Sequence, residues 1–181
     1  LRAESLFGGD GGDGGAQLGL GQPLRQVRFE NRQLLTLFGG EPLLNLPVAY
    51  YLAERCHAEC ERLGVRQVVS LITNGLLLTP EVVDRLKAHG LVGVKITLDG
   101  DRDTHNRMRP LRGRQGTFDR IIENVRQVAD QVAITIGGNF DESSVDSYPA
   151  LLDYLREQEF ADKIVKVNFK PIIRSFDQAA A

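Results

Sequence analysis

The sequence predicts an α/β fold built on a parallel sheet, and two observations support this prediction. Five segments rich in β-branched and aliphatic residues alternate with segments of helical apolar periodicity. Their starts lie about 25 to 40 residues apart, the size of a βα unit. Such units form a parallel sheet covered by helices, so a partial barrel and a doubly wound sheet both fit. The expected strands span residues 34–38, 68–72, 94–98, 132–136 and 164–169.

The helices between these strands have recognisable ends. Thr79 is expected to cap the second helix, with Pro80 at its first position. Thr117 is expected to cap the third, and Ser144 or Ser147 to begin the fourth. Helical spacing predicts which residues form the buried faces of the third and fourth helices: Ile121, Ile122, Val125 and Val128 in the third, and Leu151, Leu152 and Leu155 in the fourth.

Composition indicates one domain that lies outside the membrane. The chain has 181 residues, 42% of them hydrophobic, with a net charge of -2, so no global charge favours nucleic acid or an anionic membrane as partner. No apolar run approaches the ~18 residues of a membrane span, and no secretory signal is recognisable, which makes the cytoplasm the expected location. We expect a flexible glycine-rich leader at 1–22, the folded domain at 23–175 and a tail at 176–181.

Glycines, amides and carboxylates follow all five expected strands. Parallel strands direct their carboxyl ends to one side, so these residues are expected to converge. Such residues also make turns in any protein, and the functional interpretation therefore depends on the agreement of all five strand ends. The residues concerned are Gly39, Gly40, Glu41, Thr73, Asn74, Gly75, Asp99, Gly100, Gly137, Gly138, Asn139, Asn168 and Lys170.

Four short motifs occur in a particular order along the chain. They are LFGGEPLLN at 37–45, TNG at 73–75, TLDG at 97–100 followed by His105 and Arg109, and GTF at 116–118. In this order the sequence resembles the radical S-adenosylmethionine superfamily, specifically its anaerobic sulfatase-maturase and SPASM peptide-maturase branch. The resemblance extends from residue 34 to residue 171. It implies a parallel six-stranded partial barrel of the TIM type.

The resemblance implies roles for several of these residues in binding S-adenosylmethionine. Gly39, Gly40 and Glu41 correspond to the strand end that binds the methionyl amino group in this family. The chemistry agrees, since a carboxylate accepts charge-assisted hydrogen bonds from an ammonium group and glycines let a ligand approach the backbone. Thr97 corresponds to a hydroxyl residue near the cofactor ribose, and Asn139 to a polar residue near the cofactor.

Three further residues are expected at the margin of this site. Asn74 and Asp99 are expected to shape the rim or to touch the substrate. Arg109 matches a family position and is expected to bind a carboxylate of the cofactor or substrate. The surrounding arginine-rich stretch, 102–114, is otherwise interpreted as a solvated loop because aspartates are interspersed in it.

The family's chemistry requires a cofactor that this chain is not expected to hold alone. Reductive cleavage of S-adenosylmethionine there yields a 5′-deoxyadenosyl radical that takes hydrogen from a peptide or protein, with an electron from a reductant such as flavodoxin or ferredoxin. A four-iron, four-sulfur cluster held by Cys-x3-Cys-x2-Cys passes on that electron. This chain has two cysteines, Cys56 and Cys60. Their spacing predicts a buried helix face shared with Val48 and Leu52, so no metal ligands are expected.

The leading hypothesis is therefore a fragment of a radical S-adenosylmethionine enzyme that lacks the first βα unit and the cluster loop. The chain starts at Leu1 rather than Met, which also predicts a fragment. An unpaired strand at 34–38 is then expected to promote association. The alternative is a non-catalytic module that binds a peptide or nucleotide. A weaker third interpretation is a doubly wound nucleotide-binding domain, although no G-x-G-x-x-G motif or P-loop lysine is found.

Overall fold

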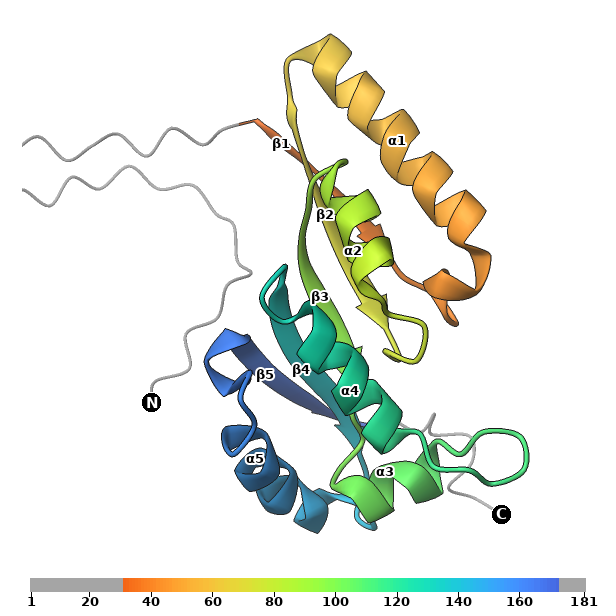
Figure 1. Ribbon diagram of the computed structural model, residues 1–181, viewed down its shortest axis with the longest axis vertical. Coiled ribbons are helices and arrows are strands. Elements are labelled where there is room, and N and C mark those ends of the chain that lie inside the picture. The colour runs from red at the N-terminus through yellow and green to blue at the C-terminus, as the bar shows by residue number, and fades with distance from the viewer. Residues whose placement is uncertain (1–30, 173–181) are drawn as a thin grey trace, which may run out of the picture.

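The computed structural model of the chain describes residues 31–172. Its centre is a five-stranded sheet in which all neighbouring strands are parallel and the spatial order follows the sequence order (Figure 1). This confirms the α/β class and the partial barrel, and it excludes the doubly wound arrangement, in which the strand order reverses. The sheet is not closed. The strands are β1 (Arg32–Leu37), β2 (Arg66–Thr73), β3 (Leu91–Thr97), β4 (Ala133–Phe140) and β5 (Ile164–Pro171).

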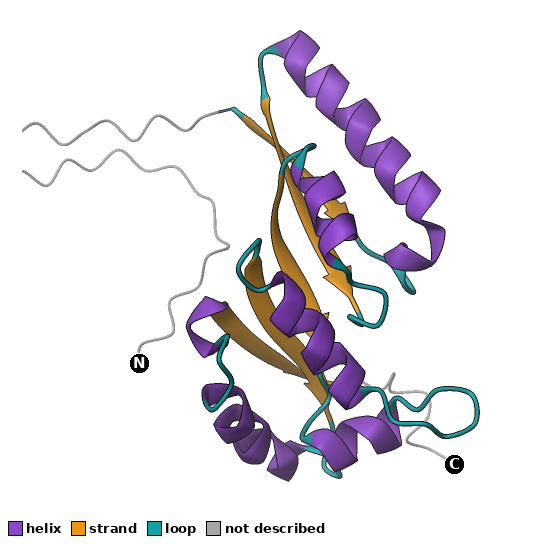
Figure 2. Ribbon diagram, in the orientation of Figure 1, coloured by secondary structure: helices purple, strands orange, loops and turns teal. Residues whose placement is uncertain are grey.

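The helices cover one face of this sheet (Figure 2). They are α1 (Leu46–Leu63), α2 (Pro80–Lys87), α3 (Arg102–Met108), α4 (Phe118–Val128) and α5 (Tyr148–Arg156), with short 3-10 turns at Pro42–Asn45, Val145–Ser147 and Ala161–Lys163. The strand residues on the other side, which we call the helix-free face, have no helix packed against them among residues 31–172. Each strand thus has a core side and a helix-free side.

The core lies between the sheet and the helices. Alternate residues of the central strands, such as Leu71, Ile96 and Ile136, are fully buried because side chains of a strand point to opposite faces in turn. The predicted stripe of α4 is confirmed, since Ile121 and Val125 and their apolar neighbours are buried. Thr79 caps α2 as expected by accepting a hydrogen bond from the Val82 amide.

The buried face of α1 differs from the prediction. Val48 and Leu52 are 49% and 41% exposed, whereas Ala49, Ala53 and Cys60 are buried. The two stripes lie side by side on the helix, and the alanine stripe lets the helix axis approach the sheet more closely than larger side chains would. Cys60 is therefore a core residue, and Cys56 is half-buried at the margin of that face.

The arginine-rich stretch is also more ordered than expected. Its first part forms α3, and the carboxylate of the N-cap residue Asp101 accepts a hydrogen bond from the Thr104 amide at 2.9 Å. Thr104 and His105 are buried, so this part is a helix rather than the expected loop, whereas Arg102 and Arg107 are exposed as expected. A loop between α3 and α4 does protrude from the body of the molecule (Figure 2).

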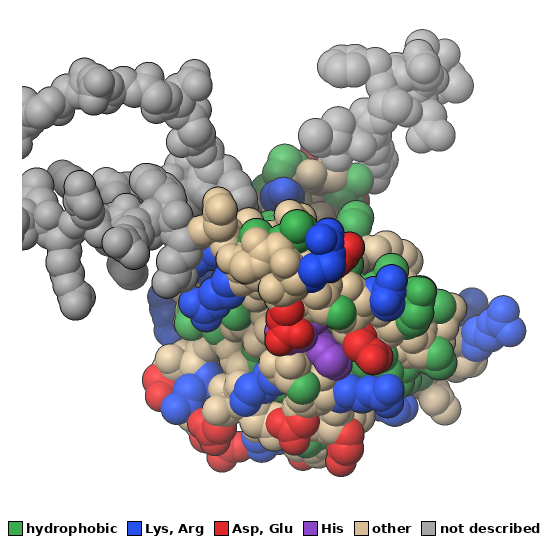
Figure 3. All heavy atoms as spheres, turned by 90° about the horizontal axis from the view of Figure 1, so that it is seen from above, with side chains coloured by type: hydrophobic (Ala, Val, Ile, Leu, Met, Phe, Trp, Pro, Cys, Tyr) green, Lys and Arg blue, Asp and Glu red, His purple; other side chains and the backbone are tan. Residues whose placement is uncertain are grey.

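Charges are mixed on the surface, and the expected leader and tail lie outside the described residues. Basic and acidic side chains are interspersed over the end seen from above (Figure 3). Within 31–172, no helix is long and apolar enough to cross a membrane. Residues 1–22 and 176–181 fall outside this range, as do the first and last residues of the domain expected at 23–175.

Candidate functional site

The carboxyl ends of the five strands meet at one edge of the sheet, which we call the rim. It consists of residues 38–41, 73–75, 97–100, 138–141 and 168–171, and Figure 1 shows the arrowheads of the strands directed to this side. The convergence follows from the parallel register of all four strand pairs. Each site residue expected from the sequence lies at the rim or, like Arg109, contacts a residue there.

Glu41 is fixed at the rim by hydrogen bonds that join two strand ends. Its Oε1 accepts from the Leu43 amide at 3.1 Å and from the Thr73 hydroxyl at 2.7 Å, while Oε2 accepts from the Asn74 amide at 2.7 Å. An ionised carboxylate has about four acceptor positions. One position of Glu41 therefore stays available for a further donor, and its carboxylate is held before any ligand arrives.

Gly39 and Gly40 precede this carboxylate and leave open space beside the backbone. A Cβ added to either would meet no heavy atom within 4 Å among the described residues. Gly39 has a φ of 153°, a conformation that residues with side chains rarely adopt. The two glycines thus expose the backbone next to Glu41, which suits the close approach of a ligand.

Thr97 and Asn139 lie on the helix-free face, in a cavity of about 470 Å³. The cavity is further lined by Phe38 from the end of β1, Ile72 from β2 and Lys170 from β5. Its volume falls within the ~300 to 1,000 Å³ typical of small-molecule sites. Glu41 and Asn74 line a different, smaller cavity of about 220 Å³. The structure therefore brings Thr97 and Asn139 together and places Glu41 in a separate cavity, with which theirs shares no lining residue.

Asp99 is a buried acceptor that holds the ends of β3 and β4 together. Its side chain is 4% exposed, and its carboxylate accepts from the Asn139 amide at 2.7 Å and from Nε of Arg109. Arg109 thus pairs with a carboxylate of the chain itself. The backbone position of Asn139 depends directly on Asp99.

His105 is a buried residue that holds the Asp99 backbone in place. Its Nδ1 accepts a hydrogen bond from the Asp99 amide, and its Nε2 faces the Thr117 hydroxyl, which donates to the Arg109 carbonyl. Because the Thr117 hydroxyl donates its proton to the Arg109 carbonyl, Nε2 of His105 is the donor to the Thr117 oxygen. Nδ1 is an acceptor and carries no proton, so the imidazole is neutral. Burial lowers the pKa of His105 to about 4, and the Asp99 charge opposes this shift only in part. His105 is therefore a neutral positioning group.

Sequence reasoning missed two other features of the site. Tyr148 donates a hydrogen bond to the Asn139 carbonyl at 3.0 Å, and burial raises the pKa of its phenol. Lys95, which was not expected at the site, lines the same cavity as Thr97 and Asn139, together with Lys170, which was expected at a strand end. The period-two alternation of a strand places Lys95 on the same face as Thr97, and this signal was available in the sequence.

The described residues do not fit an iron-sulfur cluster. The whole sequence has two cysteines, one fewer than the thiolates that the superfamily motif supplies. Cys60 lies near the end of α1, far along the chain from Glu41, and its thiol contacts Oε1 of Gln67 at 3.7 Å. Within residues 31–172, no group of three His, Cys, Asp or Glu side chains is arranged to hold a metal ion.

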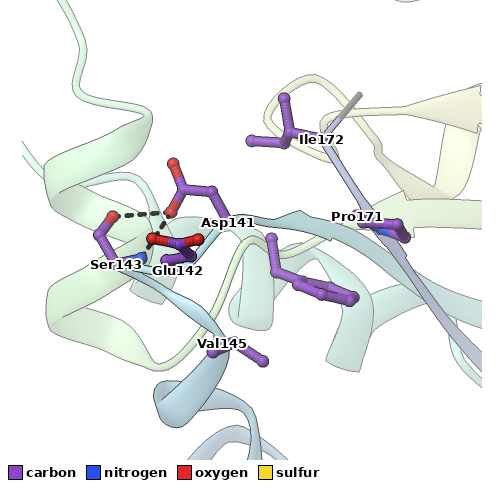
Figure 4. A pocket seen from close by; sticks show the side chains of 7 residues that line it. Asp141, Glu142, Ser143, Val145, Pro171 and Ile172 are labelled. Atoms are coloured by element: carbon purple, nitrogen blue, oxygen red, sulfur yellow. Dashed lines mark hydrogen bonds between the residues drawn. The ribbon is translucent and has the colours of Figure 1, made fainter. Parts of the chain in front are cut away.

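A further cavity of about 640 Å³ lies beyond the end of β4 (Figure 4). Asp141 closes the turn there, since its carboxylate accepts from the amide and hydroxyl of Ser143. Pro171 and Ile172 form the opposite wall, where the described part of the chain ends. None of the site residues expected from the sequence lines this cavity.

Comparison with known proteins gives a family match and several relatives. Residues 20–143 match the Radical SAM superfamily. The chain is 35% identical over 133 residues to GTP 3',8-cyclase from Synechococcus sp. (strain CC9605), covering 70% of this chain and 38% of that protein. It is 33% identical over 140 residues to Fe-coproporphyrin III synthase from Methanosarcina barkeri (strain Fusaro / DSM 804), covering 75% and 31%.

The fold has a similar counterpart among solved structures. The native anSMEcpe structure with bound AdoMet and Kp18Cys peptide superposes with a TM-score of 0.65 at 16% identity, covering 79% of this chain and 38% of that one. At this identity, the similarity concerns the fold alone. The chain spans less than two fifths of the length of each of these relatives.

Proposed function

Because this chain belongs to the radical S-adenosylmethionine superfamily, we propose that its rim binds S-adenosylmethionine. The observation that carries the proposal is the family match itself, which covers the strand ends where Glu41, Thr97 and Asn139 lie. The anchored carboxylate, the open glycines and the cavity on the helix-free face support it.

The proposed roles follow the chemistry of the residues. Glu41 offers its remaining acceptor position to the methionyl ammonium, and Gly39 and Gly40 let that group approach the backbone. Thr97 and Asn139 offer a hydroxyl and an amide to the ribose side of the cofactor. Asp99 and His105 keep Asn139 in place without touching the ligand.

The proposed biochemical role is that of the cofactor-binding part of a radical enzyme. In this superfamily bound S-adenosylmethionine supplies a 5′-deoxyadenosyl radical. This chain's residues bind and orient the cofactor, whereas two cysteines do not provide the cluster's ligands. Catalysis by the chain alone is not proposed, and the four-iron, four-sulfur cluster and a reductant such as flavodoxin or ferredoxin belong to the intact enzyme.

The relatives and the family resemblance indicate two classes of substrate. The sulfatase-maturase and SPASM branch implies a peptide or protein, and the anSMEcpe structure contains a peptide. The relatives with higher identity are instead named for a GTP cyclase and for syntheses of Fe-coproporphyrin and heme. We therefore propose a peptide or a multiply charged small molecule as substrate.

The proposal is tested by anaerobic calorimetry of S-adenosylmethionine binding to the full 181-residue chain. We expect weak binding without iron that is lost in Glu41→Ala and weakened in Thr97→Val, because each substitution removes a polar contact to the ligand. Glu61→Ala is the matched control, since that carboxylate is exposed on α1 and pairs with His57. Thermal unfolding of each variant verifies that it is folded. A folded chain that binds no S-adenosylmethionine would overturn the proposal.

The second candidate is a non-catalytic module that keeps the cavity to bind a peptide or nucleotide. The cysteine count favours it, because two thiolates do not make a cluster site. Absorbance after attempted iron-sulfur reconstitution separates the two cases together with the calorimetry. Binding of a peptide or nucleotide without S-adenosylmethionine binding supports the module, and uptake of a cluster contradicts it.

A further inference from the structure

The helix-free face carries a cluster of lysines. Lys95 on β3 lies in one cross-strand row with Thr135 on β4, and Thr135 lies opposite Lys166 on β5. Lys170 lies opposite Asn139, four residues beyond the Thr135–Lys166 pair toward the rim. Residues in register across a parallel sheet share a face, and two strand spacings amount to roughly 10 Å. The three lysines therefore lie on the same face of the sheet, one on β3 and two on β5.

The packing around Lys95 indicates that its side chain is directed across the sheet. A Cβ added to Gly137 on β4 would lie 2.2 Å from Cε of Lys95. The lysine thus passes directly over Gly137 toward β5, and a side chain at that position would displace it. Lys95 and Lys170 together line the cavity that also contains Thr97 and Asn139.

These positive charges are uncompensated by the described part of the chain. None of the five strands contains an aspartate or glutamate, and no ion pair involves the three lysines within residues 31–172. Lys163, by contrast, pairs with Asp130 and Asp162 outside this face. Burial lowers the pKa of Lys95, and the charges of Lys170 and Lys166 lower it further. Like charges gathered in a partly buried cavity are stabilised when an anion binds.

We infer that Lys95, Lys166 and Lys170 bind the phosphate or carboxylate groups of a polyanionic substrate beside the cofactor. The inference rests on the proposed function for the identity of the neighbouring ligand. Lys95 is two residues from Thr97 on the same face, and Lys170 is in register with Asn139, so both ligands meet in one cavity. A neutral peptide gains nothing from these charges. The face therefore favours a multiply charged small molecule over a neutral peptide.

The test measures binding of tripolyphosphate and of citrate to the full chain by calorimetry at low salt. We expect Lys95→Gln and Lys170→Gln each to weaken binding about tenfold, the effect of losing one charged hydrogen bond. Lys87→Gln, on an exposed position of the last turn of α2, serves as the control and changes binding less than twofold. Gly137→Ala is a second variant, expected to weaken binding by displacing Lys95 without removing a charge.

The two probes distinguish the sources of the anionic groups. Tighter binding of tripolyphosphate assigns the lysines to a phosphate-containing substrate, and tighter binding of citrate assigns them to a polycarboxylate. Three results would overturn the inference: no binding of either probe, equal weakening by Lys87→Gln, or a parallel loss of S-adenosylmethionine affinity in the lysine variants. Glu41→Ala is expected to remove S-adenosylmethionine binding and to keep tripolyphosphate binding, so the two proposals fail separately.

Discussion

At the scale of single residues, the glycines at the ends of β1 and β4 have different reasons for being glycine. Gly40 has open space where a Cβ would stand, whereas a Cβ on Gly138 would lie 2.1 Å from the Leu98 carbonyl oxygen and 2.7 Å from the Tyr148 hydroxyl. Gly138 therefore permits a backbone contact between strand ends, and Gly40 is available to a ligand.

This difference predicts that alanine at Gly138 affects stability, whereas alanine at Gly40 affects ligand binding. Gly138→Ala is expected to lower the free energy of unfolding by ~2 kcal/mol or more, because the new methyl group overlaps backbone atoms. Gly40→Ala is expected to change it by less than ~0.5 kcal/mol and to act on cofactor binding instead. Urea denaturation and calorimetry measure the two quantities. Equal stability losses in both variants would contradict this account.

His105 makes a pH-dependent contribution to stability. In the fold it stays neutral down to a pKa of about 4, whereas in the unfolded chain it takes up a proton below about 6.5. Between these values the unfolded state binds more protons, so its contribution is complete above pH 6.5 and is lost as the pH falls toward 4.

We therefore expect the free energy of unfolding to decrease by up to ~3 kcal/mol between pH 6.5 and pH 4 through this residue. Urea denaturation across this range measures the slope. His105→Gln keeps a polar side chain without a titrating ring, so the slope is expected to be shallower in that variant. Slopes that are identical in the two proteins would show that His105 does not titrate in this way.

At the scale of secondary-structure elements, α4 is capped by a residue from another helix. Thr117 stands at the N-cap, but its hydroxyl donates to the Arg109 carbonyl and makes no cap. Oδ1 of Asn106, on α3, accepts from the amides of Thr117 and Phe118 instead. Gly116 allows this contact, since a Cβ there would lie 2.6 Å from the Asn106 side chain.

Asn106→Ala is accordingly expected to cost about 1 to 2 kcal/mol of stability, the usual effect of removing a helix cap. Asn106→Asp keeps an acceptor at the positive end of α4 and is expected to retain most of the stability. Chemical denaturation of the three proteins measures both effects. A loss in Asn106→Asp as large as that in Asn106→Ala would point to packing rather than capping.

At the scale of the whole molecule, β1 forms an edge of the sheet with apolar groups exposed beside it. Leu34 and Phe38 are 56% and 73% exposed, and Leu44 and Val48 continue the apolar surface toward α1. Within residues 31–172, no strand pairs with the outer edge of β1. Such an edge is a template for pairing with another chain.

Isolated expression of this chain is therefore expected to yield oligomers or aggregates. Leu34→Lys places a charge on the exposed side of β1 and is expected to increase the monomer fraction, because charged edges resist pairing. Sedimentation velocity measures the distribution, with Val92→Lys, an exposed apolar position on the central strand β3, as the control. A monodisperse wild-type monomer would count against the open edge.

Much of the fold and part of the site were accessible from local patterns. Segments rich in β-branched and aliphatic residues predicted the five strands, although the observed boundaries differ by up to four residues, and turn residues located the rim. Along each strand, side chains alternate between the two faces of the sheet. The same alternation pairs Lys95 with Thr97 on one face. The prediction that Val48 and Leu52 are buried was wrong, because helical periodicity alone does not decide which of two adjacent stripes on a helix packs against the sheet.

The sequence by itself determined the order of strands and helices, the cap at Thr79 and the Gly-Gly-Glu strand end, because these depend on residues that are close along the chain. The tertiary structure alone decided that Asn106 caps α4, that Asp99 holds Asn139 and that Lys95 meets the charges of β5. Those contacts join residues that are far apart in sequence, and they form only when packing of the helices on the sheet has set the register between strands.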